Sequence, residues 1–183
     1  MKSLQDVGAH ALNTYPGTWR KEGGSKTEGN IIDEEYKEGI YVGYRWADRE
    51  KQRPVFAFGH GLSYTQFAIS NLRADKASMT AADSITFTVQ VKNIGQRAGS
   101  ETVQLYVHDA KASVDRPLKE LKGFCKVSLQ PGESKDVSIT LGKDALSFYD
   151  ETTASWKAEA GQFEAWVGNA SDNLKLKKTF ELK

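Results

Sequence analysis

The chain has 183 residues with 25 basic and 24 acidic side chains, and its net charge of +1 gives no electrostatic reason to expect nucleic acid or an anionic membrane as a partner. Hydrophobic residues make up 39% of the sequence, which is enough for a folded core. No apolar run approaches the roughly 20 residues that a membrane-spanning helix needs. The length leaves room for one domain and a substantial extension.

The first part of the chain, residues 1–65, is rich in turn-forming residues and poor in periodic structure. It contains nine glycines and two prolines, and its apolar residues follow no helical period. Only Tyr36–Trp46 and Val55–Phe58 are predicted to form short strands. Because a segment of this length without regular structure rarely folds alone, we expect it to lie along a surface supplied by something else. Its first six residues are polar, so the sequence predicts no signal peptide at this start.

Aromatic residues and glycines are concentrated between Tyr36 and Thr65. Seven aromatic residues and four glycines occur in the runs 36–46 and 56–65, although aromatics make up only 10% of the chain. This combination predicts a backbone packed closely against flat side chains. The stretch therefore indicates a packed joint and not a free linker.

From about Gln66 onwards, apolar and polar residues alternate with a period of two, which is the pattern of strands with one buried face. The predicted strands are 85–91, 103–107, 122–129, 137–141, 156–160, 162–167 and 174–182. Pro131-Gly132 is a type II turn signal, since proline presets φ and glycine accepts a positive φ. The short strands without an intervening helix predict an all-β fold, an antiparallel β-sandwich over residues 66–183 that follows a long, largely irregular N-terminal extension.

Residues 144–150 are predicted to hold one helical turn at most. Leu146, Phe148 and Trp156 are expected to fill the space between the sheets, and Tyr149 to bond the backbone at a corner of the sandwich. Cys125 is the only cysteine, which excludes an intrachain disulfide, and its alternating apolar neighbours predict a small buried hydrophobe.

The motifs of common enzyme sites are absent from the sequence. The three histidines lie far apart and no CxxC or HExxH spacing occurs, so we expect no metal site. His60 and Ser63 are neighbours in a glycine-rich turn, but the sequence places no acid to orient the histidine, which favours a turn role over catalysis. The acidic run 33–35 is typical of a solvated face, whereas a glycosidase needs two suitably spaced carboxylates, the acid having a raised pKa.

Arg45, Trp46 and Asp48 are the residues best suited to contact a sugar. Trp46 offers a flat ring for stacking, and Arg45 and Asp48 offer polar contacts. An Arg–Asp pair that closes a loop is the alternative interpretation. Asn169-Ala170-Ser171 matches the pattern of an N-glycosylation acceptor, although such triplets also arise by chance.

Several of these segments, in the same order along residues 15–183, resemble the C-terminal part of glycoside hydrolase family 3. Residues 36–46 and 58–65 are similar to the end of that family's α/β-sandwich domain. The segments that resemble its fibronectin type III-like domain are Val103–Val107, Arg116–Phe124, Leu129–Glu133, Leu146–Asp150 and Val167–Gly168. Ala47 departs from the pattern, since the family usually carries a second aromatic residue at this position.

The resemblance implies that the parent enzyme is a β-glucosidase or a related exo-acting β-glycosidase. Residues 1–65 would be a remnant of the α/β-sandwich domain, and residues 66–183 an immunoglobulin- or fibronectin type III-like domain. The nucleophilic aspartate and the glutamate acid/base of the family would lie in parts of the parent that this chain does not contain. We therefore assign no catalytic residue, no metal and no cofactor, and expect no hydrolysis by this chain alone. The family often works in the periplasm or outside the cell, but this sequence does not fix the compartment.

The same resemblance predicts a structural role beside the missing barrel and α/β-sandwich domains, through which the chain would meet an oligosaccharide or β-glucoside. Residues 111–120, with Arg116, Pro117, Lys119 and Glu120, are the expected docking loop because rigid and charged groups interrupt the strand pattern there. Without those domains, residues 1–65 must pack back on the sandwich, self-associate or stay disordered.

Two alternatives remain open from the sequence. The chain could be an autonomous carbohydrate-binding or adhesion module that uses exposed aromatic rings such as Trp19, Trp46 or Trp166. Alternation places Trp166 on the strand face opposite its apolar neighbours, which fits this use. A natural short protein that acts in trans with a partner is the second alternative.

Overall fold

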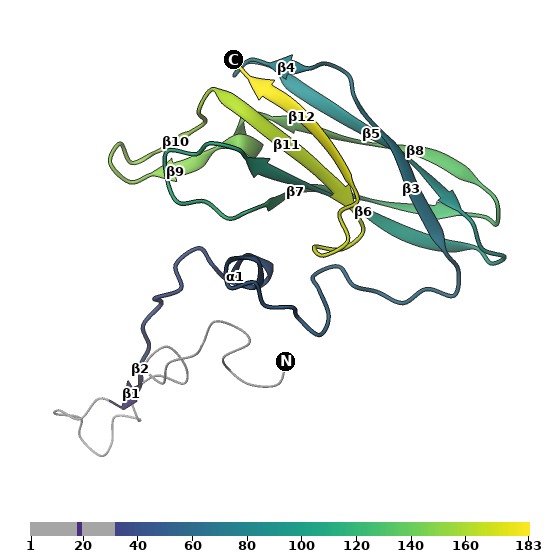
Figure 1. Ribbon diagram of the computed structural model, residues 1–183, viewed down its shortest axis with the longest axis horizontal. Coiled ribbons are helices and arrows are strands. Elements are labelled where there is room, and N and C mark those ends of the chain that lie inside the picture. Colours follow the sequence, from purple (N-terminus) through teal and green to yellow (C-terminus); the bar gives the residue numbers. More distant parts are fainter. Residues whose placement is uncertain (1–17, 20–31) are drawn as a thin grey trace, which may run out of the picture. The chain divides into compact units, whose positions relative to one another are not determined.

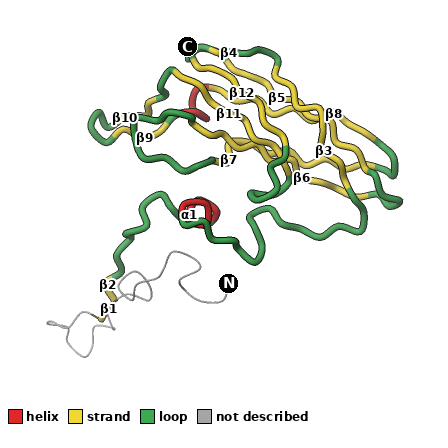
Figure 2. Tube along the Cα trace, in the orientation of Figure 1, coloured by secondary structure: helices red, strands yellow, loops and turns green. Residues whose placement is uncertain are grey.

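The computed structural model describes residues 18–19 and 32–183, and the chain divides into two compact units between Ala57 and Phe58. In the first unit, β1 (Thr18–Trp19) pairs antiparallel with β2 (Ile32–Asp33). The second unit carries all the longer strands, and strands dominate the described residues (Figure 2). No helix among the described residues is long and apolar enough to span a membrane.

The stretch predicted as a strand at Tyr36–Trp46 instead forms turns followed by the helix α1 (Tyr44–Arg49), so that prediction was wrong. Gly43 precedes the helix with φ 61 and ψ −128, a backbone conformation that residues with a Cβ rarely adopt. The chain therefore leaves the extended path at this glycine. Val55–Phe58 likewise forms bends and a turn and not the predicted strand. The close packing predicted for this stretch was also wrong for much of it, since Tyr36 and Phe56 are largely exposed and only Tyr41 and Ala57 are buried.

The C-terminal end of α1 is closed by a Schellman motif. The Gln52 N–H donates to the Ala47 carbonyl at 2.9 Å, and the Lys51 N–H donates to the Asp48 carbonyl at 3.3 Å. Lys51 takes the left-handed conformation, with φ 52, that glycine usually supplies in this motif. These bonds satisfy carbonyls that the helix end would otherwise leave unpaired.

The second unit is an antiparallel β-sandwich, as the alternation predicted (Figure 1). One sheet has the strand order β4-β12-β11-β6-β7 and the other β3-β5-β8, and only the short β4–β12 pairing is parallel. A separate hairpin pairs β9 with β10, and a 3-10 turn, η2, precedes it. The elements are β3 (Phe67–Ala74), β4 (Ser78–Met79), β5 (Ser84–Asn93), β6 (Gly99–Asp109), β7 (Glu120–Leu129), β8 (Ser134–Gly142), η2 (Lys143–Leu146), β9 (Phe148–Asp150), β10 (Ser155–Lys157), β11 (Gly161–Gly168) and β12 (Leu176–Leu182).

The core lies between the two sheets and is built by the inward residues of each strand. Phe180 of β12 joins the aromatic part of this core, with its ring 5.2 Å from Phe87 and 5.7 Å from Phe163 between centroids. The buried members of the core are Met79, Ile85, Phe87, Val89, Val91, Val103, Leu105, Val107, Val127, Leu129, Val137, Leu141, Leu146, Phe163, Ala165, Val167, Phe180 and Leu182.

The predicted type II turn at Pro131-Gly132 is confirmed. The Glu133 N–H donates to the Gln130 carbonyl at 3.0 Å, and Gly132 has the required positive φ of 77. The carboxylate of Glu133 also accepts a hydrogen bond from the Gln130 N–H. The pKa of the Glu133 carboxyl is lowered, mainly by this backbone bond and then by its contact with Lys135.

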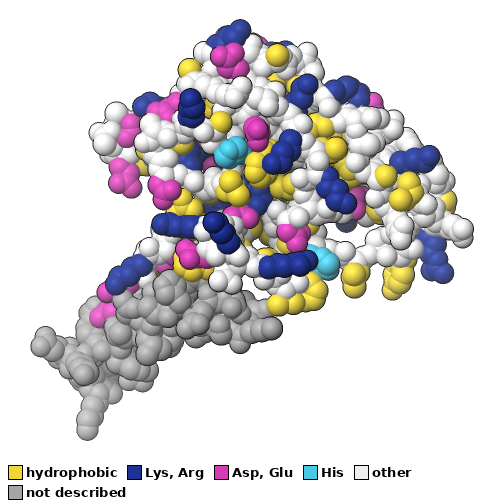
Figure 3. Space-filling model, viewed as in Figure 1, with side chains coloured by type: hydrophobic (Ala, Val, Ile, Leu, Met, Phe, Trp, Pro, Cys, Tyr) yellow, Lys and Arg dark blue, Asp and Glu magenta, His cyan; other side chains and the backbone are white. Residues whose placement is uncertain are grey.

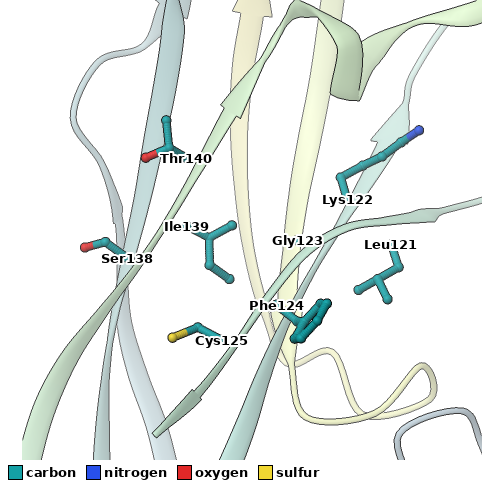
Figure 4. A pocket seen from close by; sticks show the side chains of 8 residues that line it. All are labelled: Leu121, Lys122, Gly123, Phe124, Cys125, Ser138, Ile139 and Thr140. Carbon is teal, nitrogen blue, oxygen red and sulfur yellow. The ribbon is translucent and has the colours of Figure 1, made fainter.

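The two sheets leave an open edge where β7 faces β8. Gly123 lies so close to Ile139 that a Cβ on the glycine would stand 2.4 Å from the Ile139 Cγ2, and Figure 4 shows Ile139 pointing towards Gly123. An open hollow of about 570 Å³ follows this edge, lined by residues 121–125 and 138–140. Cys125 is half-buried here and packs against the core, close to its predicted role.

Trp156 is the clearest error in the predicted core. Leu146 is fully buried as expected, but the Trp156 side chain is 69% exposed on the β9–β10 hairpin. Tyr149, predicted to bond the backbone at a corner, is half exposed and packs its ring against Trp156. The hairpin turns away from the two main sheets, so alternation along its strands does not point into the sandwich.

Candidate functional site

Residues 58–65, which we call the strap, cross one end of the sandwich before β3 begins. The strap is fixed at its first end, where the Phe58 carbonyl accepts a hydrogen bond from the Ser171 N–H at 2.8 Å. Gly59 adopts φ 87 and lies directly on the loop after β11, since an added Cβ would stand 2.0 Å from the Gln104 Nε2 and 3.0 Å from the Asn169 carbonyl oxygen. Glycine is therefore required at this crossing.

A chain of buried and half-buried polar groups supports this first attachment. The Tyr106 hydroxyl donates to Gln104 at 2.6 Å, and the Gln104 amide donates to the Asn169 carbonyl at 2.9 Å. The Asn169 side chain in turn donates to Glu101 and accepts a hydrogen bond from Asn173. Because both ends of the Asn169 amide are engaged, the triplet that matches a glycosylation acceptor holds the loop together instead of presenting a free amide.

The second end of the strap is fixed by Thr65. Its hydroxyl donates to the Asn93 Oδ1 at 2.7 Å, and Asn93 is completely buried. Gly95 and Gly99 make room for this contact, since a Cβ on Gly95 would stand 2.2 Å from the Thr65 hydroxyl oxygen and one on Gly99 would stand 2.7 Å from the Thr65 methyl. The strap is thus attached to the sandwich at both ends.

Between these attachments the strap holds large apolar side chains out in solvent. Leu62 is 95% exposed and Tyr64 is 92% exposed, and Phe58 is also more than half exposed. Full burial of a leucine side chain stabilises a protein by about 1.5–3 kcal/mol, and the fold gains none of this from Leu62. Exposed apolar residues that cluster on a fixed backbone are typical of a contact surface.

The predicted docking loop, 111–120, is held inward by Arg116. Its guanidinium donates to Asp109 at 3.1 Å, to Glu120 at 2.6 Å and to the Leu146 carbonyl at 3.0 Å. The Arg116 side chain is only 8% exposed and also lies 5.8 Å from the centre of the Phe148 ring. Arg116 therefore shapes the loop from within the sandwich, where a buried cation is stabilised by its two carboxylate partners.

Other members of the loop differ in which way they face. Pro117 and Lys119 are buried, and Glu120 is tied to Arg116 and Lys122. Val114 and Leu118 are the large apolar side chains that the loop exposes.

A further tie joins this loop to the segment after β10. The Ser113 hydroxyl and N–H both donate to the Glu159 carboxylate, at 2.6 and 3.1 Å. The Ser113 hydroxyl, followed by its backbone N–H, lowers the pKa of the Glu159 carboxyl below its ordinary value. The loop and the β9–β10 region are therefore linked by a charge-assisted contact.

The predicted sugar-proximal residues all lie on α1 in the first unit. Arg45 and Asp48 are three positions apart, which places them on neighbouring positions of one helix face, and Trp46 is half-buried. Each of the three takes part in contacts within the chain, including a bond from Arg45 to the Ile40 carbonyl at 3.5 Å. Their placement near a sugar stays a prediction.

The acidic run and the glycine-rich turn singled out in the sequence can be placed in the structure. Asp33, Glu34 and Glu35 are all exposed, as expected for a solvated face. Ser63 accepts a hydrogen bond from the Thr65 N–H, which fits the turn role expected for this segment. Among residues 18–19 and 32–183, no group of three or more His, Cys, Asp or Glu side chains is arranged to hold a metal ion. His10 lies outside the described residues.

Trp166 is not an open platform for a sugar ring. It lies on the outer face of β11, as alternation predicted, but the Lys177 ammonium stands 3.6 Å from the ring centre. The His108 ring packs 5.3 Å away, and the indole N–H donates to Glu164. The side chain of Trp19 lies outside the described residues.

Comparison with known proteins identifies the second unit. A family model for the fibronectin type III-like domain matches residues 101–171. The sandwich is a fibronectin type III-like domain. Thermostable β-glucosidase B of Acetivibrio thermocellus is 49% identical over 145 residues, covering 79% of this chain and 19% of its own length. β-Glucosidase BoGH3A of Bacteroides ovatus is 46% identical over 180 residues, covering 97% of this chain and 22% of its own length.

The solved structures agree with the sequence relatives. The GH3 β-glucosidase of Bifidobacterium adolescentis matches 98% of this chain with a TM-score of 0.82 and 34% identity, and the chain covers 24% of that structure. The resemblance to family 3 glycoside hydrolases that the sequence motifs indicated is thereby confirmed. The chain spans about a fifth of the length of the curated relatives it matches.

The aromatic and glycine-rich pattern of the sequence marks the stretch that contains the strap but not the attachments of the strap. Gly59 and Thr65 belong to the motif that carried the family resemblance, whereas Asn93 and Gly95 lie between the predicted strands 85–91 and 103–107. The bond between Thr65 and Asn93 joins positions 28 residues apart, which no local pattern reveals. The exposure of Leu62 and Tyr64 also required the fold, because an apolar residue in a turn is equally compatible with burial.

Proposed function

We propose that this chain is the non-catalytic C-terminal region of a family 3 β-glucosidase and that it stabilises the catalytic domains by docking on them. The strap supports this docking proposal, because its backbone is fixed at both ends while the Leu62 and Tyr64 side chains are almost fully exposed to solvent. A partner that buries these two side chains would recover the hydrophobic stabilisation that the isolated fold lacks. The partner proposed is the larger remainder of the β-glucosidase, by analogy with relatives more than four times as long.

The loop 111–120 is proposed as a second contact that extends towards the sugar cleft of the parent. Arg116, Pro117, Lys119 and Glu120 act in this proposal as the inner support of the loop, because their side chains are buried or tied within the sandwich. Val114 and Leu118 would make the contact itself. Preorganisation of the loop by Arg116 lowers the entropy cost of docking.

The proposal is tested in a chimera of β-glucosidase BoGH3A, in which this chain replaces the matching 22% of the enzyme. We expect an active chimera, and a Leu62→Ser/Tyr64→Ser double variant that melts at a lower temperature and loses activity earlier on heating. The same double substitution should leave the stability of the 183-residue chain alone unchanged within about 0.5 kcal/mol, since both side chains are already exposed.

Phe124→Ser is the matched control, because Phe124 is also largely exposed but belongs to β7 and not to the strap. It should change neither the chimera nor the isolated chain. An unchanged melting temperature of the Leu62→Ser/Tyr64→Ser chimera would remove the basis for docking through the strap.

A further inference from the structure

The β9–β10 hairpin presents two aromatic side chains to solvent side by side. Tyr149 and Trp156 are directly opposite in the antiparallel register, so their side chains lie on the same face of the hairpin. Trp156 is 69% exposed and Tyr149 is 51% exposed, and their rings meet edge to face at 5.7 Å between centroids and 74° between planes. The pair forms an aromatic corner on the surface, which we call the Tyr–Trp corner.

The core of the sandwich does not account for this corner. The residues that fill the space between the sheets belong to the main strands, β4 and η2, and neither Tyr149 nor Trp156 is among them. The hairpin is a separate two-stranded sheet. An exposed tryptophan beside an exposed tyrosine is the composition that marks contact sites, because each ring combines a large apolar face with one hydrogen-bonding group.

The hairpin is stiffened by its own polar groups. The Asp150 carboxylate accepts hydrogen bonds from the Thr152 hydroxyl at 2.6 Å and from the Thr152 N–H at 3.0 Å, and these bonds lower the pKa of the Asp150 carboxyl. The Thr153 and Ser155 hydroxyls are 2.9 Å apart across the turn. A corner held by such a turn loses little conformational freedom when it binds a ligand.

The loop 111–120 borders the same region. Ser113 is bonded to Glu159, three residues after Trp156, and Arg116 contacts both the Leu146 carbonyl and the Phe148 ring. These contacts join the loop before β7 to η2, to β9 and to the segment after β10. The Tyr–Trp corner is therefore built onto the sandwich and does not depend on the hairpin alone.

The chemistry around the corner favours a neutral polyhydroxylated ligand. The neighbouring side chains are the hydroxyls of the turn and charged groups of both signs, with Lys157 and Glu159 in an ion pair at 3.3 Å. On the face of the sandwich shown in Figure 3, basic and acidic side chains are interspersed, without a broad area of one sign.

We propose that the Tyr–Trp corner is a binding subsite for neutral β-linked glucan chains, with a sugar ring stacked on the Trp156 indole and the turn hydroxyls near its edge. The choice of a β-glucan over other neutral glycans rests on the proposed function, whereas the neutral sugar class rests on the residues of the corner. Such a subsite would hold a glucan chain by contact alone.

The test titrates the complete 183-residue chain with laminarihexaose and with cellohexaose, following the indole N–H signals by NMR. We expect the Trp156 signal to shift in a saturable way with at least one of the two glucans. Trp156→Ala should weaken binding about tenfold or more, and Tyr149→Ala by a smaller factor. Trp166→Phe is the matched control and should leave binding unchanged, because Trp166 is already covered by Lys177 and His108.

The competing outcomes each overturn the proposal. Absence of a saturable shift with both hexasaccharides removes the glucan subsite, and equal binding of polygalacturonate removes the preference for neutral chains. Concentration-dependent self-association that disappears in Trp156→Ala would assign the corner to a second copy of the chain. These results are independent of the docking test, since the titration reads binding by the chain alone and the chimera reads thermal stability through Leu62 and Tyr64.

Discussion

Asn93 is completely buried, and all the hydrogen-bonding capacity of its side-chain amide is used. Its oxygen accepts bonds from the Thr65 hydroxyl and the Gly95 N–H, and its nitrogen donates to the carbonyls of Arg97 and Leu129. These four bonds join the strap, the β5–β6 turn and the end of β7. A single side chain therefore fixes the relative positions of three segments that are distant in sequence.

Substitution of Asn93 by alanine should be strongly destabilising. The change leaves two carbonyls and two donors without their partner in a buried place, so we expect a loss of about 2–3 kcal/mol in the free energy of unfolding. Urea denaturation of the chain measures this loss. Ser100→Ala is the control, because Ser100 also bonds a side chain, that of Ser128, but at an exposed position, and it should cost less than about 0.5 kcal/mol.

Ala154 is an alanine in the left-handed region of backbone conformation, with φ 48. This conformation costs a residue with a Cβ about 1 kcal/mol relative to glycine. Ala154→Gly should therefore stabilise the β9–β10 hairpin, which amide hydrogen exchange at Trp156 and Lys157 would report as slower opening. Asn71, at φ 57 in the bulge of β3, tests the reverse change, and Asn71→Ala should lower stability. Equal exchange rates in wild type and Ala154→Gly would contradict the expected strain.

The elements that could be predicted from the sequence are those with one buried face and one solvated face. β5 is the clear case, because Ile85, Phe87 and Val89 alternate with Thr86 and Thr88, whose hydroxyls bond β8 on the outer face of the sheet. In Tyr36–Trp46, by contrast, Ile40, Val42, Tyr44 and Trp46 also alternate, but the last two lie in the helix α1. There Gly43 and Lys51 decide the local structure through backbone conformations that the hydrophobic pattern does not encode.

The candidate site was predictable only in part for a related reason. The motif in residues 58–65 could be recognised, but its meaning depends on Gly59, Gly95 and Gly99 allowing close approach of distant segments. The alternating pattern alone predicted Trp156 in the core. The β9–β10 hairpin leaves the main sheets, however, and its direction depends on the turn, which alternation does not encode. Contacts between distant segments and the direction of short hairpins are properties of the folded chain.

The hydrogen bonds between Ser113 and the Glu159 carboxylate, which hold the loop 111–120, should weaken at low pH. Hydrogen bonds lower the pKa of the Glu159 carboxyl from its ordinary 4.5, so the ionised form stabilises the folded arrangement above that pH. This contribution is lost as the pH falls through the depressed pKa of the folded state. We expect the Ser113 amide signal in NMR to titrate with a midpoint below 4.5.

Glu159→Gln should abolish that titration of the Ser113 signal. The Gln130 amide, which donates to Glu133, gives an independent reporter in the same experiment and should keep its own titration in this variant. A midpoint for Ser113 at or above the ordinary value would show that the carboxylate does not hold the loop.

At the scale of the whole molecule, the strap belongs to the folded unit that contains the sandwich. The compact unit begins at Phe58, before the first long strand begins at Phe67. A shortened chain of residues 58–183 should therefore unfold cooperatively with the stability of the complete chain, because every core residue is retained. Removal of the strap as well, leaving residues 66–183, should cost about 1–2 kcal/mol through loss of the Thr65 bond to buried Asn93. Calorimetry of both shortened chains checks this.

The exposed side chains of the strap should also affect how the chain behaves at high concentration. Leu62 and Tyr64 offer apolar area that a second molecule can cover, so we expect weak self-association by light scattering that increases with concentration. Leu62→Ser/Tyr64→Ser should shift the chain towards the monomer, whereas Phe124→Ser should not. Identical scattering from all three chains would exclude the strap as the self-contact.

The attachment of the strap at both ends has a consequence for how such domains can be exchanged between enzymes. A recombination point placed just before β3 would take the strap from one parent and the sandwich from the other. The contacts of Thr65 with Asn93 and of Gly59 with Gln104 would then join residues from two different proteins. A crossover at the divide between Ala57 and Phe58 would carry the strap and its receiving glycines together. The natural unit of inheritance would then be longer than the sandwich by the eight residues of the strap.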